Sequence, residues 1–349
     1  MISHSSRLPR PRRLGWWSRL HRLRAPLGRD LGIDLGTANT VIVVRGRGVV
    51  LTQPSYVAID REEGRIIAIG SEAKEMVGRV PDHIEVIRPL RAGVISDFEA
   101  AQTMLRELIR RVHRRRALVK PRIVVCVPSG VTQVEERAVE EAVVEAGARK
   151  AVIVTEPLAA ALGAGLPVDG PKGCMVVDVG GGTTEVAVFS LGAMVVGHSA
   201  RVGGDAIDQA VIAFLRKQHG IQVGERTAEK IKWAVATASP RDNETIAEIL
   251  GRDVVDGRPR RILIGEDEFR EGIGEPIQAI VDAVTSVFDR MPPELTPDVV
   301  ARGITLTGGG ALLAGLDERI ADETGVQVFV DREPLSCVAR GAGLLLERL

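Results

Sequence analysis

The stretch CMVVDVGGGTTEVAVFS at residues 174–190 decides the fold of this chain. An aliphatic run leads into Asp178, a glycine-rich turn with two threonines follows, and a second aliphatic run leaves the turn. The same order occurs in LGIDLGTANTVIVV at residues 31–44, where Asp34 takes the place of Asp178. A third glycine-rich turn, in ITLTGGGALL at residues 304–313, again follows an aliphatic run. Repetition at about one domain length predicts two related α/β domains that face each other across a cleft.

These turns have the composition of phosphate-binding loops. Glycine lets the backbone approach a ligand closely, and the N–H groups and threonine hydroxyls of such a turn can point at phosphate oxygens. Asp34 and Asp178 stand at strand ends and are predicted to hold Mg²⁺ through water, because Mg²⁺ keeps much of its hydration shell. Each turn alone could be an ordinary β-hairpin turn, but three of them favour a shared polyphosphate site. The predicted phosphate-binding residues are Gly36, Thr37, Ala38, Asn39, Thr40, Gly180, Gly181, Gly182, Thr183 and Thr184.

The segments between the turns predict alternating strands and helices. Residues 97–116 carry apolar side chains at helical spacing after Asp97, which can cap the helix. RIVVCVPSG at 122–130 predicts a buried strand, 131–147 an acidic helix, and AVIVTEP at 151–157 a further strand. Strands that alternate with helices predict parallel βαβ units.

The composition suits a globular α/β protein. At 349 residues the chain is long enough for two domains, and with only 3% aromatics the core must be filled by aliphatic residues. Lys+Arg and Asp+Glu balance at 46 each, so net charge gives no reason to expect a nucleic-acid partner. Cys126, Cys174 and Cys337 have neither metal-ligand nor disulfide spacing and are expected to be buried in a reducing cytosol. No apolar run reaches the roughly 20 residues of a membrane span.

Long strings of the sequence resemble the MreB/Mbl family of bacterial actins, in the superfamily that also holds heat-shock chaperones and sugar kinases. They are GIDLGTANT, EPLAAALGAGLPV, GGDAID, ERTAEKIK, LTGGGALLAGL and PLSCVARGAG, in the family's order and spacing. The resemblance implies an actin-like ATPase fold: two duplicated α/β domains with ribonuclease H-like cores around a nucleotide cleft, each with a smaller subdomain. The implied organisation is a basic N-terminal extension at 1–29, a first domain at 30–157 with a subdomain near 50–95, a second domain at 158–333 with a subdomain near 205–270, and at 334–349 a connection and helix that return to the first domain.

The resemblance also implies roles for residues along the cleft. Glu156 would orient the water that attacks ATP, with Thr183 helping to hold it, and Asp208 would lie near the γ-phosphate and the metal. The alternative for Glu156 is a carboxylate that only caps the following helix at 159–163. Contacts with the nucleoside part of ATP are implied for Glu229, Lys232, Gly308, Gly309, Gly310 and Ala311.

Two segments predict contact with an anionic membrane surface. The first is the Arg-rich segment 1–29, in which tryptophans and leucines at helical spacing suit an amphipathic anchor; disorder, a misassigned start codon and a transit peptide are its alternatives. The second is the loop around 111–123, where the resemblance implies insertion of two apolar residues; its alternative is a solvated basic loop. The predicted membrane residues are Trp16, Trp17, Leu20, Leu23, Leu118 and Val119.

The leading functional hypothesis is a slow ATPase of the cytoskeleton. By resemblance, the chain would bind ATP and Mg²⁺, form homopolymer filaments on the inner face of the cell membrane, and organise peptidoglycan synthesis with cell-wall elongation proteins. The alternatives are a sugar-type kinase and a chaperone-like ATPase switch. A kinase would need a base near an acceptor hydroxyl, and a chaperone would need a peptide-binding domain, and we identify neither in the sequence. The sequence leaves open whether the chain is of the MreB or the Mbl type and whether it also uses GTP.

Overall fold

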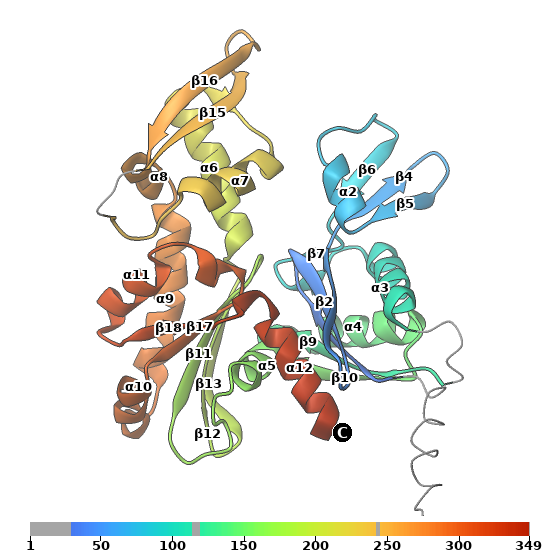
Figure 1. Ribbon diagram of the computed structural model, residues 1–349, viewed down its shortest axis with the longest axis vertical. Helices are drawn as coiled ribbons and strands as arrows, with labels where there is room; N and C mark the ends of the chain where they lie inside the picture. The colour runs from blue at the N-terminus through green and yellow to red at the C-terminus, as the bar shows by residue number, and fades with distance from the viewer. Residues whose placement is uncertain (1–28, 114–118, 242–244, 349) are drawn as a thin grey trace, which may run out of the picture.

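Two lobes lie side by side and meet at their lower ends (Figure 1). The structure is a computed structural model that describes residues 29–113, 119–241 and 245–348. We call residues 30–155 the first lobe and residues 174–336 the second lobe. Each lobe has a five-stranded sheet at its base and a smaller group of strands and helices above that sheet.

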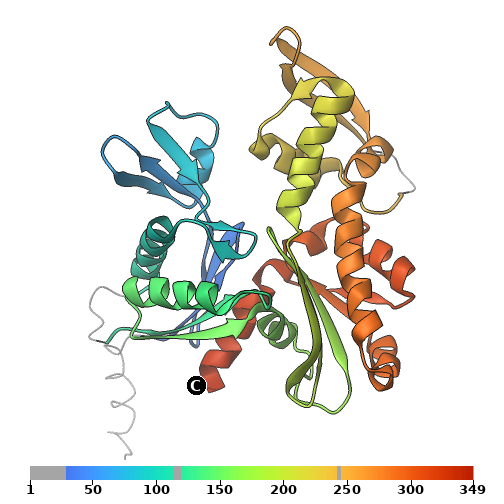
Figure 2. The same cartoon turned by 180° about the vertical axis from the view of Figure 1, so that it is seen from behind.

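The sheet of the first lobe forms around the predicted strand–turn–strand segment. β1 pairs antiparallel with β2 and parallel with β9, which places Asp34 at the β1 end beside Val41 and Cys126. Helices α3 and α4 cover one face of this sheet, as Figure 2 shows from behind. The strand order is β10-β9-β1-β2-β3. The bounds are β1 Leu31–Leu35, β2 Asn39–Val44, β3 Gly48–Pro54, β9 Arg122–Val127, β10 Lys150–Thr155, α3 Phe98–Val112 and α4 Gln133–Glu145.

The sheet of the second lobe repeats this topology. β11 pairs antiparallel with β12 and parallel with β17, so Asp178 takes the place that Asp34 has in the first lobe. The strand order β13-β12-β11-β17-β18 corresponds to β3-β2-β1-β9-β10, and the two cores are therefore copies of one plan. The bounds are β11 Cys174–Val179, β12 Thr184–Ser190, β13 Ala193–Ala200, β17 Ile304–Thr307, β18 Val328–Val330, α9 Gly274–Arg290, α10 Thr296–Arg302 and α11 Leu316–Thr324, with short 3-10 turns η1 Pro293–Leu295, η2 Gly309–Leu312 and η3 Pro334–Ser336.

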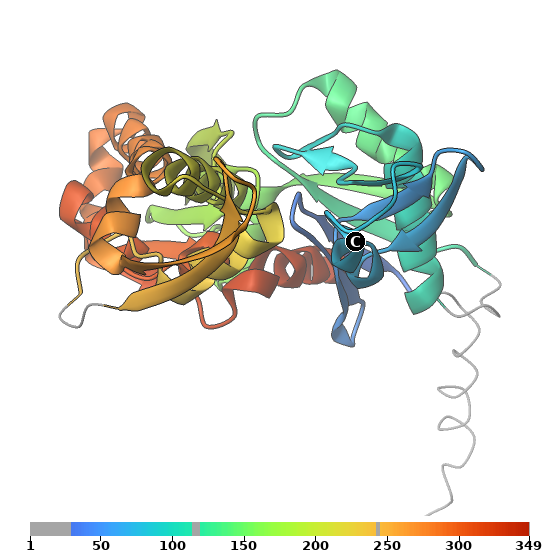
Figure 3. The same cartoon turned by 90° about the horizontal axis from the view of Figure 1, so that it is seen from above.

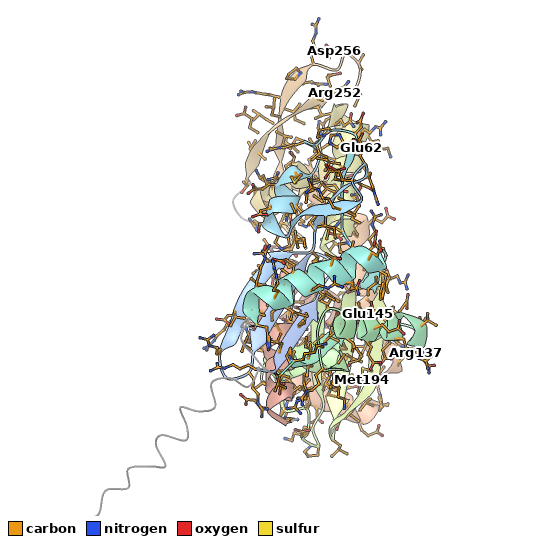
Figure 4. All side chains as sticks on the ribbon, turned by 90° about the vertical axis from the view of Figure 1, so that its right-hand side faces the viewer. Glu62, Arg137, Glu145, Met194, Arg252 and Asp256 are labelled. Carbon is orange, nitrogen blue, oxygen red and sulfur yellow. The ribbon has the colours of Figure 1, made fainter. Side chains whose placement is uncertain are left out.

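A smaller group of elements stands above each sheet. Figure 4 views the molecule from the side of the first lobe; Asp256, in the turn between β15 and β16, lies at the opposite end of the molecule from Met194 on β13. The upper group of the first lobe consists of β4 Val57–Asp60, β5 Arg65–Ile69, α2 Ser71–Met76, β6 Ile84–Ile87, β7 Leu90–Arg91 and β8 Val94–Ile95. That of the second lobe consists of α6 Gly204–His219, β14 Ile221–Gln222, α7 Glu225–Val235, β15 Ile246–Asp253, β16 Pro259–Gly265 and α8 Glu266–Gly272.

Two helices, α5 (Glu156–Gly163) and α12 (Cys337–Arg348), join the lobes. Figure 3, from above, shows α12 running between the lobes. The helices cross at glycines: a Cβ on Gly163 would lie 1.9 Å from the Cys337 carbonyl oxygen, and one on Gly341 would lie 1.8 Å from the Ala159 carbonyl oxygen. The crossing therefore brings the two backbones into direct contact, which only glycine permits.

The local predictions can be compared with these elements. The helix expected at 97–116 is α3, and the Asp97 side chain caps it by accepting a hydrogen bond from the Ala100 N–H, as predicted, although the helix already ends at Val112. The prediction of buried cysteines is confirmed for all three. The third glycine-rich turn contains the 3-10 turn η2, and the α-helix α11 follows it from Leu316. In the described ranges, every helix is too short or too polar to cross a membrane.

Candidate functional site

A cleft of about 600 Å³ lies between the lobes. Its walls come from the turns that follow β1, β11 and β17 and from the starts of α5 and α6. The second half of α7 and the η3–α12 connection complete them. These three turns stand at the carboxyl ends of strands that run parallel to their neighbours β9, β17 and β11, which is where open α/β sheets bind ligands. The fold thus brings all three glycine-rich turns of the sequence to one cavity.

The first turn is held in shape from behind. The Ser55 hydroxyl donates to the Gly36 carbonyl at 2.7 Å, and the Thr37 hydroxyl accepts from the Gly93 N–H at 3.0 Å. These two hydrogen bonds hold the Gly36 carbonyl and the Thr37 hydroxyl in place and so stabilise the conformation of the turn beside the cleft. The predicted residues of this turn that line the cleft are Gly36, Thr37, Ala38 and Asn39.

The second turn touches the first. The Gly180 N–H donates to the Thr183 carbonyl at 2.8 Å and closes the turn. A Cβ on Gly181 would lie 2.6 Å from the Ala38 Cβ, and one on Gly182 would lie 2.6 Å from the Thr37 hydroxyl oxygen. The glycines are therefore required because the two turns approach within contact distance. The predicted residues of the second turn that line the cleft are Gly180, Gly181, Gly182 and Thr183.

The third turn leans on the strand end that carries Asp178. Gly308 has φ +83°, in the region that favours glycine, and a Cβ there would lie 2.5 Å from Oδ1 of Asp178. A Cβ on Gly310 would lie 2.3 Å from the Val179 side chain. Gly308, Gly309 and Gly310, for which contact with the nucleoside is predicted, all line the cleft, whereas Ala311 lies buried behind them.

Buried carboxyl groups crowd the floor of the cleft. Burial raises the pKa of Asp34 to about 7. Burial, followed by the charges of Asp34 and Glu185, raises the pKa of Asp178 to about 8. Burial raises the pKa of Glu156 as well, and the same neighbouring acids add to the rise. The charged form of each acid is unfavourable until a positive charge enters the cleft.

This acid cluster fits a hydrated divalent cation. Oδ1 of Asp178 is buried and has no hydrogen-bond partner in the described part of the chain. Within the same part, no group of three or more His, Cys, Asp or Glu residues is close enough to hold an ion directly. Mg²⁺ suits such a site, because it keeps several waters and is held by one or two carboxylates together with substrate phosphates. Asp34 and Asp178 are the residues that would hold it, and the ion would neutralise charge on the phosphates.

Glu156 is the first residue of α5 and lines the cleft. Its side chain is only 6% exposed. The capping position of α5 belongs to Thr155, and no side-chain hydrogen bond caps this helix end. The capping alternative for Glu156 is therefore not supported, and its carboxyl group remains available to the cleft.

Helices α6 and α7 place three predicted residues on the wall of the second lobe. The Lys232 ammonium lies 2.9 Å from Oδ1 of Asp208 and donates to the Gly204 carbonyl at 3.0 Å. Burial raises the pKa of Asp208 to about 6, although Lys232 opposes the shift. Glu229, one turn before Lys232, also lines the cleft and pairs with Lys74 of the first lobe. Lys232 thus links the α7 wall to the base of α6.

Two predicted phosphate-binding threonines lie behind the turns. The Thr184 hydroxyl donates to the Val202 carbonyl at 2.8 Å, and the Thr40 hydroxyl is hydrogen-bonded to that of Ser55 at 2.9 Å. Both threonines are fully buried and neither lines the cleft. Each hydroxyl supports its turn from behind. The sequence analysis expected both threonines to contact phosphate, and the structure instead gives their hydroxyls this supporting role.

The predicted membrane residues fall mostly outside the described residues. Trp16, Trp17, Leu20, Leu23 and Leu118 lie there, and their predicted contact with lipid stays a prediction. Val119 is described and is partly exposed, two residues before Pro121 leads into β9.

Several residues near the cleft escaped the sequence analysis. Glu185 faces inward from β12, where its carboxylate accepts from the Ser129 N–H at 3.0 Å and from the Ser129 and Ser199 hydroxyls. The sequence signal for Glu185 was an acidic residue inside the otherwise aliphatic run TTEVAVF. Asp205, Trp233 and Arg241 line the cleft without belonging to a glycine turn.

Comparison with known proteins places these features in context. A family model described as "MreB/Mbl protein" matches residues 28–349. The cell shape-determining protein MreB of Escherichia coli (strain K12) is 47% identical over 335 residues, covering 95% of this chain and 96% of that protein. The cell shape-determining protein Mbl of Bacillus subtilis (strain 168) is 44% identical over 321 residues, covering 92% and 96%. The crystal structure of MreB 5 of Spiroplasma citri bound to AMPPNP superposes with a TM-score of 0.87 at 34% identity, covering 92% of this chain and 96% of that one.

Proposed function

This chain belongs to the MreB/Mbl family and has its actin-like fold, and on that premise we propose that it is an ATP-dependent cytoskeletal protein that determines cell shape. The relatives from E. coli and B. subtilis are described as cell shape-determining proteins. Family membership disfavours the sugar-kinase and chaperone alternatives.

One observation carries the nucleotide part of the proposal. Three glycine-rich turns that are far apart in the sequence meet at one cleft, and buried acids line its floor. Such turns present backbone N–H groups to phosphates, and a cation would stabilise the charged forms of the acids. The ligand that satisfies both is a nucleoside triphosphate with Mg²⁺. The S. citri relative, whose structure contains an ATP analogue, supports ATP as that ligand.

The proposed chemistry is slow hydrolysis of ATP. Phosphoryl transfer to water needs a positioned water molecule and neutralised phosphate charge. Glu156 is the proposed residue that orients the water, because it is buried at the cleft wall and its carboxyl group caps no helix. Thr183, in the second turn, would help to hold that water. Asp208, which lines the cleft from α6, would lie beside the γ-phosphate. Glu229, Lys232 and the third turn would bind the nucleoside.

The finer parts of the function follow from the family. We propose that the chain assembles with copies of itself into filaments whose assembly is coupled to ATP hydrolysis. The filaments would lie on the cytoplasmic face of the cell membrane and organise peptidoglycan synthesis together with cell-wall elongation proteins. The Arg-rich segment 1–29 and the loop around Val119 are the proposed contacts with anionic lipid.

A single experiment tests the core of this proposal. Purified protein is pelleted with anionic liposomes, with and without ATP and Mg²⁺, and the pellets are imaged by electron microscopy. Filaments on the lipid that require ATP are the expected result. Nucleotide binding without polymer, over a range of protein and salt concentrations, would contradict the cytoskeletal part and leave a nucleotide switch.

A further inference from the structure

Lys74 of the first lobe reaches across the mouth of the cleft. It belongs to α2, and its ammonium lies 2.7 Å from one carboxylate oxygen of Glu229 on α7 and 3.0 Å from the other. Both side chains of this pair are 23% exposed, so the ion pair is only partly open to solvent. The same ammonium lies 5.8 Å from the ring centre of Trp233, one helical turn further along α7. A cation at this distance from an indole ring is attracted to its face.

Arg88 makes a second bridge between the lobes. It follows β6, and its guanidinium lies 2.6 Å from a carboxylate oxygen of Asp205 at the start of α6. Tyr56 of the first lobe supports the arginine, whose Cζ lies 5.6 Å from the centre of the Tyr56 ring. Beside these bridges, Arg226 of α7 donates to the Glu75 carbonyl of α2 at 2.8 Å. Three contacts therefore tie the upper group of the first lobe to α6 and α7.

The acids at the far side of these bridges belong to the cleft wall. Asp205 and Glu229 both line the cleft, whereas Lys74 and Arg88 do not. The Asp205 N–H donates to the Gly181 carbonyl at 2.8 Å, so the residue that Arg88 grips is hydrogen-bonded to the second phosphate turn. A movement of Arg88 is thereby transmitted to the turn through a single residue.

We propose that Lys74 and Arg88 are positioning residues for bound nucleotide, which act through Glu229 and Asp205 to hold the α6–α7 wall against the phosphate turns and so slow nucleotide release. The inference rests on the proposed nucleotide-binding function and assigns to it two cations of the opposite lobe. The two bridges form a clasp (Lys74–Glu229 and Arg88–Asp205) that must open before the ligand can leave.

The test measures release of an ATP analogue with a fluorescent N-methylanthraniloyl group from the full chain with Mg²⁺. Excess unlabelled ATP displaces the analogue in a stopped-flow instrument, at protein concentrations below the onset of polymerisation. Lys74→Met and Arg88→Met are each expected to speed release about fivefold, since a partly exposed ion pair contributes up to about a factor of that size. Added NaCl should speed release from the wild type and have little effect on the double variant, because salt screens exposed charges.

The controls separate positioning from a general loss of stability. Lys74→Arg keeps the charge and should release at nearly the wild-type rate. Arg61→Met removes a more exposed ion pair, with Glu85, that lies within the first lobe, and should change nothing. Release within twofold of wild type in both methionine variants would overturn the proposal. A wild-type chain that binds no analogue would instead overturn the nucleotide function, and this inference with it.

A second readout asks whether the clasp forms in solution. The chain has three tryptophans, so Trp16→Phe with Trp17→Phe leaves Trp233 as the sole indole. In that background, Lys74→Met should change the Trp233 emission, because the ammonium no longer lies near the ring, whereas Arg61→Met should not. Identical emission with and without the Lys74 charge would show that the contact is not made.

Discussion

Asp30 and Arg122 connect the neighbouring strands β1 and β9 at their starts. Oδ1 of Asp30 accepts from the Arg122 N–H at 2.9 Å, and Oδ2 accepts from its guanidinium at 2.7 Å. The carboxylate thus binds backbone and side chain of one residue at once. Burial by itself raises the pKa of Asp30, but the hydrogen bonds and charge of Arg122 outweigh it, and the net pKa is lowered.

This pair predicts an acid-dependent contribution to stability. Since the folded pKa of Asp30 lies below its unfolded value of about 4, its stabilisation is present above that pH and is lost as pH falls through the folded pKa. Asp30→Asn should lower the free energy of unfolding by about 1.5–3 kcal/mol at neutral pH, the range for hydrogen bonds to charged groups. Urea unfolding at pH 7 and pH 3 measures the difference. An equal loss at both pH values would contradict the role of the charge.

Gly181→Ala should weaken nucleotide binding. Its Cβ would lie 2.6 Å from that of Ala38, so the two phosphate turns would have to move apart. Overpacking of this kind costs about 1–3 kcal/mol, which corresponds to a loss of ATP affinity of about fivefold to 150-fold. Isothermal titration with ATP and Mg²⁺ measures it. Gly224→Ala is the matched control, because a Cβ there meets nothing within 4 Å; equal affinities of the two variants would refute the explanation.

Glu156→Ala should separate binding from hydrolysis. The alanine leaves no side-chain group to orient the attacking water, so phosphate release should fall by a factor of about 10². ATP affinity should be kept or increased, because one negative charge leaves a crowded acid cluster. Phosphate release and analogue binding are measured on the same preparation. Unchanged turnover would remove Glu156 from the mechanism.

Gly341→Ala should disrupt the junction between the lobes. The new Cβ would lie 1.8 Å from the Ala159 carbonyl oxygen, a rigid backbone atom, so α12 must shift away from α5. We expect a loss of roughly 3 kcal/mol or more, at the upper end of overpacking costs, seen as a lower Tm. Leu344→Ala, at a 44% exposed site on the same helix, should change the Tm little. A Gly341→Ala variant as stable as this control would show that the crossing is loose.

Deletion of residues 1–28 should weaken co-sedimentation with anionic liposomes, most clearly at low salt, because arginine-rich segments are attracted to anionic lipid. A Trp16→Ala/Trp17→Ala variant keeps every arginine and tests the apolar part alone. If the deletion loses liposome binding and the double tryptophan variant keeps it, the charge of the segment is sufficient for membrane binding. No change in the deletion would remove the segment from the proposed membrane contact.

The sequence predicted the features that repeat locally. A strand, an aspartate and a glycine turn occur in order along the chain, so both Asp34 and Asp178 and the duplicated plan could be read directly. The direction of individual side chains was harder to predict. Thr40 and Thr184 follow their turns closely but already belong to β2 and β12, where the pleat sets the side-chain direction. Both hydroxyls turn away from the cleft.

Contacts between distant segments left no local pattern. Lys74 and Glu229 are separated by 155 positions in the chain, and each alone resembles an ordinary surface charge. Glu185 was overlooked because a buried acid in an aliphatic strand has meaning only when its serine partners from other segments are known. Tertiary placement, and not propensity, decides the role of such residues.

The glycine crossing of α5 and α12 makes the molecule resemble a pair of tongs. The chain passes between the lobes twice, and both passages run through this one crossing, so it serves as a fulcrum. The tips, marked by the turn at Asp256 and by Glu62, lie far from it (Figure 4). A small rotation at the fulcrum is therefore magnified into a larger displacement at the tips. A ligand that shifts the phosphate turns slightly can in this way reshape surfaces that it never touches.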